Sequence, residues 1–317
     1  MTPSLWTLVI GICLLAALLG LTTGMIWIER RLLAFFQDRL GPNRVGPQGL
    51  LQPVADIIKL FMKEDWMPPF ADKLIFIIAP GIIVVTVLLA FAVVPITSFI
   101  KVSDANVGIL FFLGMTSMGV YGIVLAGWAS NSKYSLIGGI RAAAQMISYE
   151  LPLGLAMASA VVLAGSLRLG DIVDAQASLW FCLLQPLGFV IFTIAGIAEA
   201  RRTPFDLPEA DSELIAGYHT EYSSMKFALF FMGEYLDIIL VSAMVTVLYL
   251  GGWHGPVLPP VLWFIIKMLA VIFVFIWARA TLPRYRFDQL LSFGWKILLP
   301  LALINIVATG AVMLAVR

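Results

Sequence analysis

Long, uninterrupted runs of apolar residues are the feature that most restricts the fold of this 317-residue chain. Several runs exceed the roughly 18–20 residues that a helix needs to cross a bilayer. Hydrophobic residues make up 61% of the sequence and charged residues 12%, about half the charged fraction of a soluble domain. The sequence therefore predicts an all-α polytopic membrane protein.

Eight spans are predicted, and residues 1–317 form a single membrane domain without repeats or linkers. The spans cover residues 5–27, 75–97, 108–128, 146–165, 179–199, 227–250, 259–281 and 293–315. Four segments are expected on the cytoplasmic side, at about 29–74, 129–145, 200–226 and 282–292.

Positive charge is distributed unevenly over the two sides of this arrangement. Sixteen of the twenty Lys and Arg residues lie in or beside the four segments, and the exceptions are Lys101, Arg168, Lys267 and Arg317. Because Lys and Arg are retained on the cytoplasmic side, the N-terminus is expected on the outer side. No Lys or Arg precedes the first apolar run, which argues against a cleavable signal.

The sequence offers little for a cofactor bound by this chain alone. Cys13 and Cys182 lie in separate apolar runs without metal-ligand spacing, so they are interpreted as small buried residues. Two thiolates cannot hold the usual iron–sulfur cluster with four cysteine ligands. Nucleotide-binding glycine motifs are also missing. If the protein takes part in redox chemistry, the nucleotide and metal centres are expected on other chains.

The segment LQPVADIIKLFMKEDW, residues 51–66, differs from the spans. Asp56, Lys59 and Lys63 follow each other at helical spacing, and apolar residues fill the positions between them. This pattern predicts an amphipathic helix that is too short to cross and lies at the membrane surface or against a partner. The helix is either a plain interfacial anchor or the wall of a site for an amphipathic ligand.

Acidic residues inside or at the ends of spans are candidate functional groups, because ionisable side chains are costly in a membrane. Glu234 and Asp237 lie within the sixth span and share a helix face. Glu29, Glu150 and Glu199 lie at span ends, where the alternative is a side chain that reaches the interface.

The segment RRTPFDLPEADSELIAGYHTEYSSMK, residues 201–226, concentrates carboxylates in an apolar chain. Asp206, followed by Pro208 and Glu209, is typical of a helix start. The helix dipole does not account for Glu213, which lies one turn beyond Glu209 and opposes its charge. Such coupled carboxylates could accept and pass protons. The alternative is a solvated loop that docks a basic partner.

Four blocks of the sequence resemble one family, in the family's order and over nearly the whole chain. They read ERRLLAFFQDRLGPNRVGPQGLLQPVADIIKLFMKED, GWASNSKYSLIGGIRAAAQMISYE, RTPFDLPEADSELIAGYHTEYSSMKFALFFMGEY and PRYRFDQLLSFGWK. The chain resembles the H subunit of bacterial proton-translocating NADH:quinone oxidoreductase (complex I), the counterpart of mitochondrial NADH dehydrogenase subunit 1.

The resemblance implies a multi-pass subunit of the bacterial inner membrane, with its N-terminus on the periplasmic side, that acts only within its complex. Its expected partners are the peripheral-arm and small membrane-arm subunits, the lipid bilayer and a quinone substrate (ubiquinone or menaquinone), but no nucleic acid. FMN and iron–sulfur clusters are expected on partner subunits, and no metal or nucleotide on this chain.

Matching motif positions also implies two groups of site residues. The quinone tunnel would include Glu29, Arg30, Arg39, Asp56, Lys59 and Arg279. The proton relay would include Glu150, Glu199, Asp206, Glu209, Asp211, Glu213, Glu221 and Glu234. The chain departs from the family at Arg201, where a neutral residue is common, and at Asp211, where Glu is common. A positive charge beside the relay would favour the ionised form of nearby carboxyls.

Two other functions remain open at this stage. Related membrane subunits serve membrane-bound hydrogenases and formate hydrogenlyases, and nickel in the native assembly without an NADH-oxidising subunit would favour that function. A stand-alone ion transporter would require transport by the isolated chain in liposomes. The GPNRVGP and PFDLPEADSEL blocks favour the respiratory form.

Overall fold

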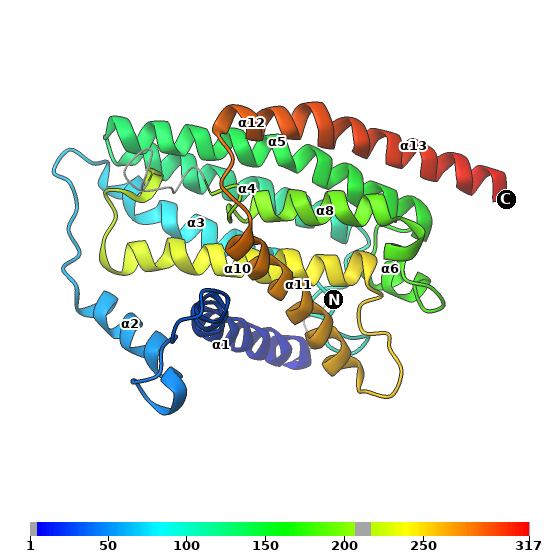
Figure 1. The fold of residues 1–317 in the computed structure, drawn as a ribbon, viewed down its shortest axis with the longest axis horizontal. Coiled ribbons are helices and arrows are strands. Elements are labelled where there is room, and N and C mark those ends of the chain that lie inside the picture. The colour runs from blue at the N-terminus through cyan, green and yellow to red at the C-terminus, as the bar shows by residue number, and fades with distance from the viewer. Residues whose placement is uncertain (1–4, 207–216, 317) are drawn as a thin grey trace.

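The structure is a computed structural model that describes residues 5–206 and 217–316, and every regular element in them is helical. Figure 1 shows most of the long helices running side by side as one bundle. Seven helices in the described residues are long and apolar enough to cross a membrane, which confirms the all-α polytopic class. They are α1 (Leu5–Phe36), α3 (Lys73–Phe91), α4 (Gly108–Ala129), α5 (Lys133–Ala164), α10 (Ser224–Tyr249), α11 (Pro260–Thr281) and the unit Phe287–Ala315.

The predicted span at 179–199 is not one continuous helix. It consists of α7 (Phe181–Leu184) and α8 (Pro186–Glu199), which meet at the non-helical residue Gln185. Pro186 has no N–H group to continue a helix, but it fits the first turn of a new one. The Gln185 amide is buried, where it donates to the Thr309 hydroxyl at 2.5 Å and accepts from Ser159 at 3.0 Å. This predicted span is therefore a 14-residue helix with a short helix before it.

Helix α10 is the centre of the bundle. In the most apolar 18-residue stretch of α10, 72% of the residues are buried, against 17% in the corresponding stretch of α1. Glycines bring its neighbours unusually close. A Cβ atom at Gly196 of α8 would lie 2.3 Å from Val241, and one at Gly233 of α10 would lie 2.7 Å from Ile83 of α3. Helix α3 therefore approaches α10 at Gly233, just before Glu234, and α8 approaches it at Val241, one turn after Asp237.

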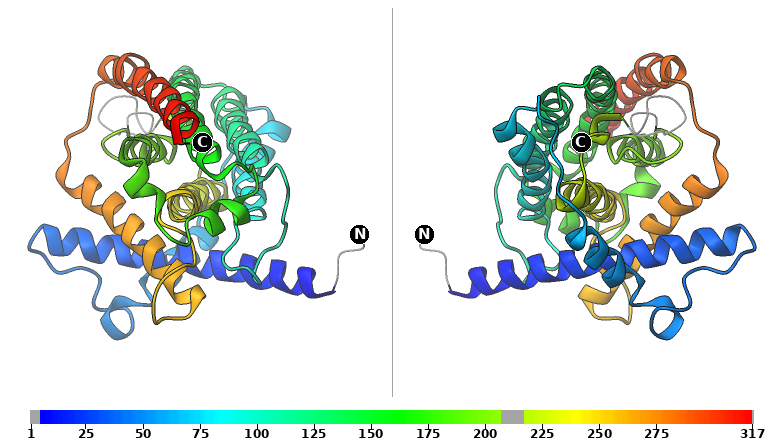
Figure 2. Two further views of the ribbon diagram at one scale, coloured as in Figure 1. Left: turned by 90° about the vertical axis from the view of Figure 1, so that its right-hand side faces the viewer. Right: turned by 90° about the vertical axis from the view of Figure 1, so that its left-hand side faces the viewer.

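Helix α1 lies at the edge of the bundle, where Figure 2 shows it running across the other helices. The predicted amphipathic helix is confirmed as α2 (Gln52–Met62), which follows the short 3₁₀ turn η1 (Pro47–Gly49). The Ser224 hydroxyl at the start of α10 donates to the Leu60 carbonyl at 2.9 Å, and Lys226 pairs with Asp65 at 2.8 Å. These contacts tie α2 to the start of α10.

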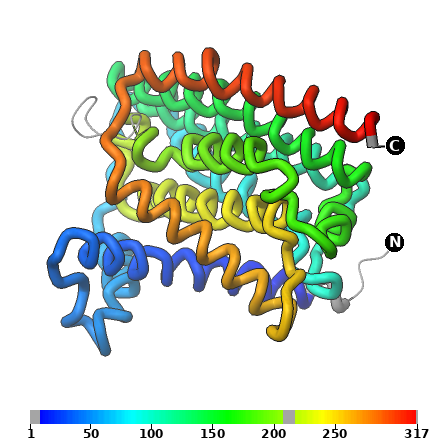
Figure 3. The backbone as a smooth tube through the Cα atoms, turned by 45° about the vertical axis from the view of Figure 1, so that its right-hand side comes forward, coloured from blue at the N-terminus to red at the C-terminus, as the bar shows by residue number. Residues whose placement is uncertain are grey.

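The remaining short elements are α6 (Leu169–Ala175) and η2 (Gly217–His219). The last span consists of α12 (Phe287–Phe293), the π-helical turn η3 (Gly294–Leu298) and α13 (Leu299–Val316). Figure 3 shows α13 along the edge opposite α1. The end at which α1 and α8 finish and α10 begins is termed the acidic end. The other end, which contains α6 and the loop at 250–259, is termed the opposite end.

Candidate functional site

An apolar groove of about 470 Å³ lies between α1, α2 and α10 at the acidic end. Nearly all of its lining is apolar, with Arg30 and Asp56 as its charged residues. The lining residues include Leu19, Thr22, Thr23, Ile26, Pro53, Ile57, Leu60, Met225, Phe227, Phe231, Met232 and Tyr235. A long apolar groove with few polar groups suits a largely apolar ligand that has one polar end.

The charged residues of the groove hold α1 and α2 together. The Arg30 guanidinium donates to an Asp56 carboxylate oxygen at 2.5 Å. Gln52 donates to the other oxygen of Asp56 at 3.1 Å, and the Lys59 ammonium lies 3.6 Å from it. The sequence prediction that the amphipathic helix forms the wall of a site fits this arrangement.

Behind the groove, Arg202 joins two buried carboxylates from different helices. Its guanidinium lies 3.2 Å from Glu29 of α1 and 2.7 Å from Glu234 of α10. All three side chains are less than 10% exposed. Arg279 of α11 also donates to Glu29. A buried charge is tolerated only when it is paired, so these contacts explain how three elements keep charges inside the bundle.

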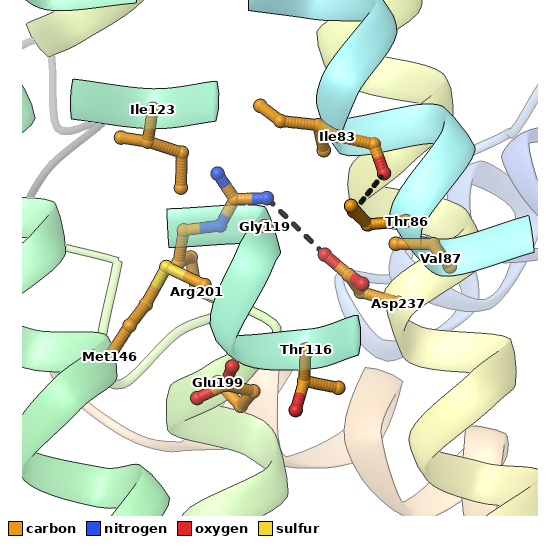
Figure 4. A pocket seen from close by; sticks show the side chains of 10 residues that line it. All are labelled: Ile83, Thr86, Val87, Thr116, Gly119, Ile123, Met146, Glu199, Arg201 and Asp237. Atoms are coloured by element: carbon orange, nitrogen blue, oxygen red, sulfur yellow. Dashed lines mark hydrogen bonds and ion pairs between the residues drawn. The ribbon is translucent and has the colours of Figure 1, made fainter. Parts of the chain in front are cut away.

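A second buried arginine, Arg201, forms an ion pair beside the contacts of Arg202. The Arg201 guanidinium lies 3.4 Å from Asp237 and donates to the Tyr218 hydroxyl at 2.8 Å. Arg201 and Asp237 line a small cavity of about 10 Å³ together with Glu199 and Thr116. Figure 4 shows the Arg201 guanidinium directed toward the Asp237 carboxylate.

Glu199 and Glu150 continue the row of charged groups into α8 and α5. Glu199 is 6% exposed, and its Oε2 atom has no hydrogen-bond partner among the described residues. It interacts electrostatically with Glu150, Asp237 and Arg201. The Ser117 hydroxyl of α4 donates to the Glu150 carboxylate. The structure therefore gathers acids from α1, α5, α8 and α10 into one region.

The groove and the buried charges share a wall. Arg30 lines the groove, whereas its neighbour Glu29 is turned toward Arg202. On α10, Tyr235 lines the groove, whereas its neighbour Glu234 pairs with Arg202. The Arg202 guanidinium also lies 4.6 Å from the centre of the Tyr235 ring. A change of charge in the groove would thus act across one layer of side chains.

The other residues named from the sequence lie farther out. Arg39 is exposed after α1 and contacts Gln37, and Lys59 is exposed beside Asp56. Asp206 pairs with Arg284 at 3.0 Å, and Glu221 is half-buried just before α10. The acids that follow Asp206 in the expected helix start, namely Glu209, Asp211 and Glu213, lie outside the described residues. Within the described residues, no three His, Cys, Asp or Glu side chains are grouped as metal ligands.

Four residues outside the two expected groups of site residues also belong to this region. They are Arg201, Arg202, Asp237 and Ser117. The sequence signal for these contacts is the spacing of Glu234 and Asp237, which places two acids on one face of a membrane-spanning helix. Acids in that position need positively charged partners. Two consecutive arginines at 201 and 202 meet that need.

An all-α membrane protein with an apolar groove backed by buried charge pairs is the class that the fold and the site define. A family model described as NADH dehydrogenase matches residues 8–310. The H subunit of the NADH-quinone oxidoreductase of Methylococcus capsulatus is 56% identical over all of both chains. The H 1 subunit of the same enzyme from Geobacter metallireducens is 56% identical over 93% of each chain. The H 2 subunit from Geobacter sulfurreducens is 55% identical over 94% of this chain and 93% of the relative. This chain belongs to the NADH dehydrogenase family, which confirms the resemblance read from its motifs.

Proposed function

We propose that this chain is the membrane subunit that binds quinone and couples its reduction to proton translocation in a bacterial NADH-quinone oxidoreductase. The observation that carries the proposal is the wall shared by the apolar groove and the buried charge pairs. Arg30 and Tyr235 line the groove, and their sequence neighbours Glu29 and Glu234 pair with Arg202. Electrons would come from FMN and iron–sulfur clusters on peripheral-arm subunits, because this chain has no motif for a redox group. Small membrane-arm subunits would receive the coupled charge.

The groove fits the passage of a quinone from the bilayer. The apolar tail would lie against the faces of α1 and α10, and the carbonyl head would meet the polar groups at Arg30 and Asp56. In this orientation the acidic end faces the cytoplasm and the N-terminus faces the periplasm of the inner membrane, which agrees with the excess of Lys and Arg around that end.

The buried acids fit a relay that responds to quinone chemistry. Reduction of a quinone to a quinol takes up two electrons and two protons, so the quinol is neutral and the groups that give up the protons gain negative charge. Across the shared wall, that change would alter the balance of protons among Glu29, Glu234, Glu199 and Glu150. The residues Asp206, Glu209, Asp211, Glu213 and Glu221 would supply the entry from the cytoplasmic side, and Arg39, Lys59 and Arg279 would border the tunnel.

A bulky substitution tests the groove. Thr23→Trp would fill it, and we expect a raised KM for quinone and at least tenfold slower NADH:quinone reduction in membrane vesicles. Ala17→Trp, on the same helix but in a separate apolar groove of about 310 Å³, is the matched control and should leave the rate unchanged. NADH oxidation by a hydrophilic electron acceptor reports assembly of the complex. Equal rates for the two variants would exclude this groove as the quinone path.

Neutralising single acids tests the relay. Glu150→Gln and Glu199→Gln are expected to lose most proton translocation and most quinone reductase activity, while electron transfer to a hydrophilic acceptor continues. A pH-sensitive dye in closed vesicles measures the translocation. Normal turnover and pumping in both variants would refute the assignment.

A further inference from the structure

Arg201 is the most deeply buried charged side chain in the described residues, at 1% exposure. It follows α8 directly, two residues after Glu199, and its side chain enters the cavity that Glu199 lines. An arginine in such a place is costly unless other groups hold its charge. Its presence beside an acid therefore calls for an explanation beyond packing.

Asp237 and Tyr218 engage this charge from different elements. Asp237 of α10 lies 3.4 Å from one terminal nitrogen of Arg201, and the Tyr218 hydroxyl of η2 accepts from the other at 2.8 Å. The Tyr218 ring centre is also 5.7 Å from the guanidinium. Arg201 and Asp237 thus place opposite charges in contact inside the bundle.

The position of this pair relates it to the relay. Asp237 lies one helical turn beyond Glu234, and Arg201 precedes Arg202, so the pair lies beside the contacts that reach the groove. On its other side is Glu199, whose Oε2 atom has no hydrogen-bond partner among the described residues. The pair therefore lies between the acids behind the groove and the acids of α8 and α5.

We propose that Arg201 and Asp237 are a counter-charge pair that sets how readily Glu199 holds a proton. Both are then positioning residues of the relay, and this inference rests on the proposed function. The charged and titratable groups around Glu199 in the described residues are Glu150 of α5, Asp237 of α10 and Arg201 itself, with Tyr218 of η2 behind Arg201.

The sign of each perturbation follows from Coulomb's law. Asp237→Asn leaves a net positive charge beside Glu199, which favours its ionised form and moves the pH profile of quinone reduction to lower pH. Arg201→Gln leaves a net negative charge and moves the profile to higher pH. Each shift is expected to be about one pH unit at the effective dielectric of a protein interior. The double variant removes both charges and should return the profile toward that of the wild type.

The test is a double-mutant cycle in the whole enzyme in membrane vesicles. NADH:quinone reduction and proton translocation are measured from acidic to alkaline pH, with a hydrophilic electron acceptor as the measure of assembly. On the acidic limb of the profile Asp237→Asn should be faster and Arg201→Gln slower than the wild type, each by up to about tenfold, the factor that corresponds to one pH unit. Arg201→Lys and Asp237→Glu keep the charges and should keep the wild-type profile.

A matched control uses the ion pair Asp104–Arg168 in the loops of the opposite end. Asp104→Asn, Arg168→Gln and their double variant carry the same chemical changes and should leave the pH profile in place. Opposite shifts that cancel in the double variant at positions 201 and 237 would support the proposal. Shifts in one direction, no shift, or a double variant that adds the two defects would overturn it.

Two further results keep the test decisive. If a single variant fails to assemble, the double neutral variant must still show the wild-type profile, and a displaced profile overturns the proposal. Glu199→Gln in the same vesicles separates this inference from the proposed function. If Glu199→Gln pumps normally, the assignment of Glu199 to the relay is wrong. If it does not pump but the pair variants shift nothing, only the role of the pair is wrong.

Discussion

The two ends of the bundle hold buried charge in different ways. At the opposite end, Lys267 of α11 is 5% exposed and donates to three backbone carbonyls, those of Leu250, Gly252 and His254, at 2.6, 3.0 and 2.6 Å. An ammonium group has three protons to donate, so every one has an acceptor. This arrangement closes the C-terminal end of α10, where a positive charge is favourable.

At the acidic end, by contrast, carboxylates share their positive partners. Arg202 serves both Glu29 and Glu234, and Glu199 keeps one oxygen without a partner in the described part of the chain. A saturated ammonium has one favourable arrangement, whereas interacting acids that share a guanidinium titrate as a coupled set. We interpret the first arrangement as structural and propose the second for transfer of charge. Four variants test this contrast, from the largest expected effect to the smallest.

Arg202→Met should have the largest effect. It leaves Glu29 and Glu234 buried without their common partner, and removing one member of a buried ion pair costs about 3–5 kcal/mol. We expect little assembled complex in the membrane, measured by quantifying the subunit and NADH oxidation by a hydrophilic acceptor. Arg202→Lys keeps the charge and should retain part of the assembly. Wild-type amounts of Arg202→Met would contradict the shared-partner description.

Ser117→Ala removes the hydroxyl that donates to Glu150 and leaves the rest of α4 in place. Loss of this hydrogen bond to a carboxyl group of the proposed relay is expected to slow quinone reduction roughly tenfold, the factor that corresponds to about 1.4 kcal/mol, while assembly stays normal. Ser130→Ala is the control, because the Ser130 hydroxyl, like that of Ser117, donates to a carbonyl of its own helix. Equal rates in the two variants would show that the Ser117 contact does not affect turnover.

Lys267→Met should lower stability but leave coupling intact. The variant leaves three carbonyls without their donor, at a cost of about 1–3 kcal/mol. The midpoint of thermal unfolding of the purified complex should fall. Protons translocated per NADH should match the wild type at a temperature where both are folded. A loss of coupling would remove the distinction between the two ends.

Asp104→Asn should have the smallest effect, and that effect should depend on pH. The Arg168 guanidinium, helped by Lys101, lowers the pKa of the Asp104 carboxyl from 3.8 to about 2, although partial burial opposes this shift. A lowered folded pKa gives stability that is complete above the ordinary value and is lost as the pH falls through the lowered one. The difference in thermal midpoint between wild type and variant should stay constant near neutrality and close between pH 3.8 and about 2. A constant difference down to pH 2 would contradict this.

The sequence by itself determined the fold class, the amphipathic helix and the acids worth attention. Each of these follows from local sequence. A span must be apolar over its own length, and a charge inside it raises the free energy whatever the rest of the fold is. It predicted a full span at 179–199, although Pro186 within that run marks where α8 begins. The contacts of neighbouring helices decide whether such an interruption is tolerated, as the buried Gln185 amide shows.

Only the tertiary structure decided which charges meet. Arg201 contacts Asp237 across 36 residues of sequence, and Arg202 contacts Glu29 across 173. Hydropathy gives each charge a cost but does not name its partner, because the partner depends on how α1, α8 and α10 are packed. The close approach of α8 to α10 at Gly196 and Val241 sets that packing. For this reason the same apolar chain holds one buried cation as a fixed cap at Lys267 and places Arg201 beside an acid.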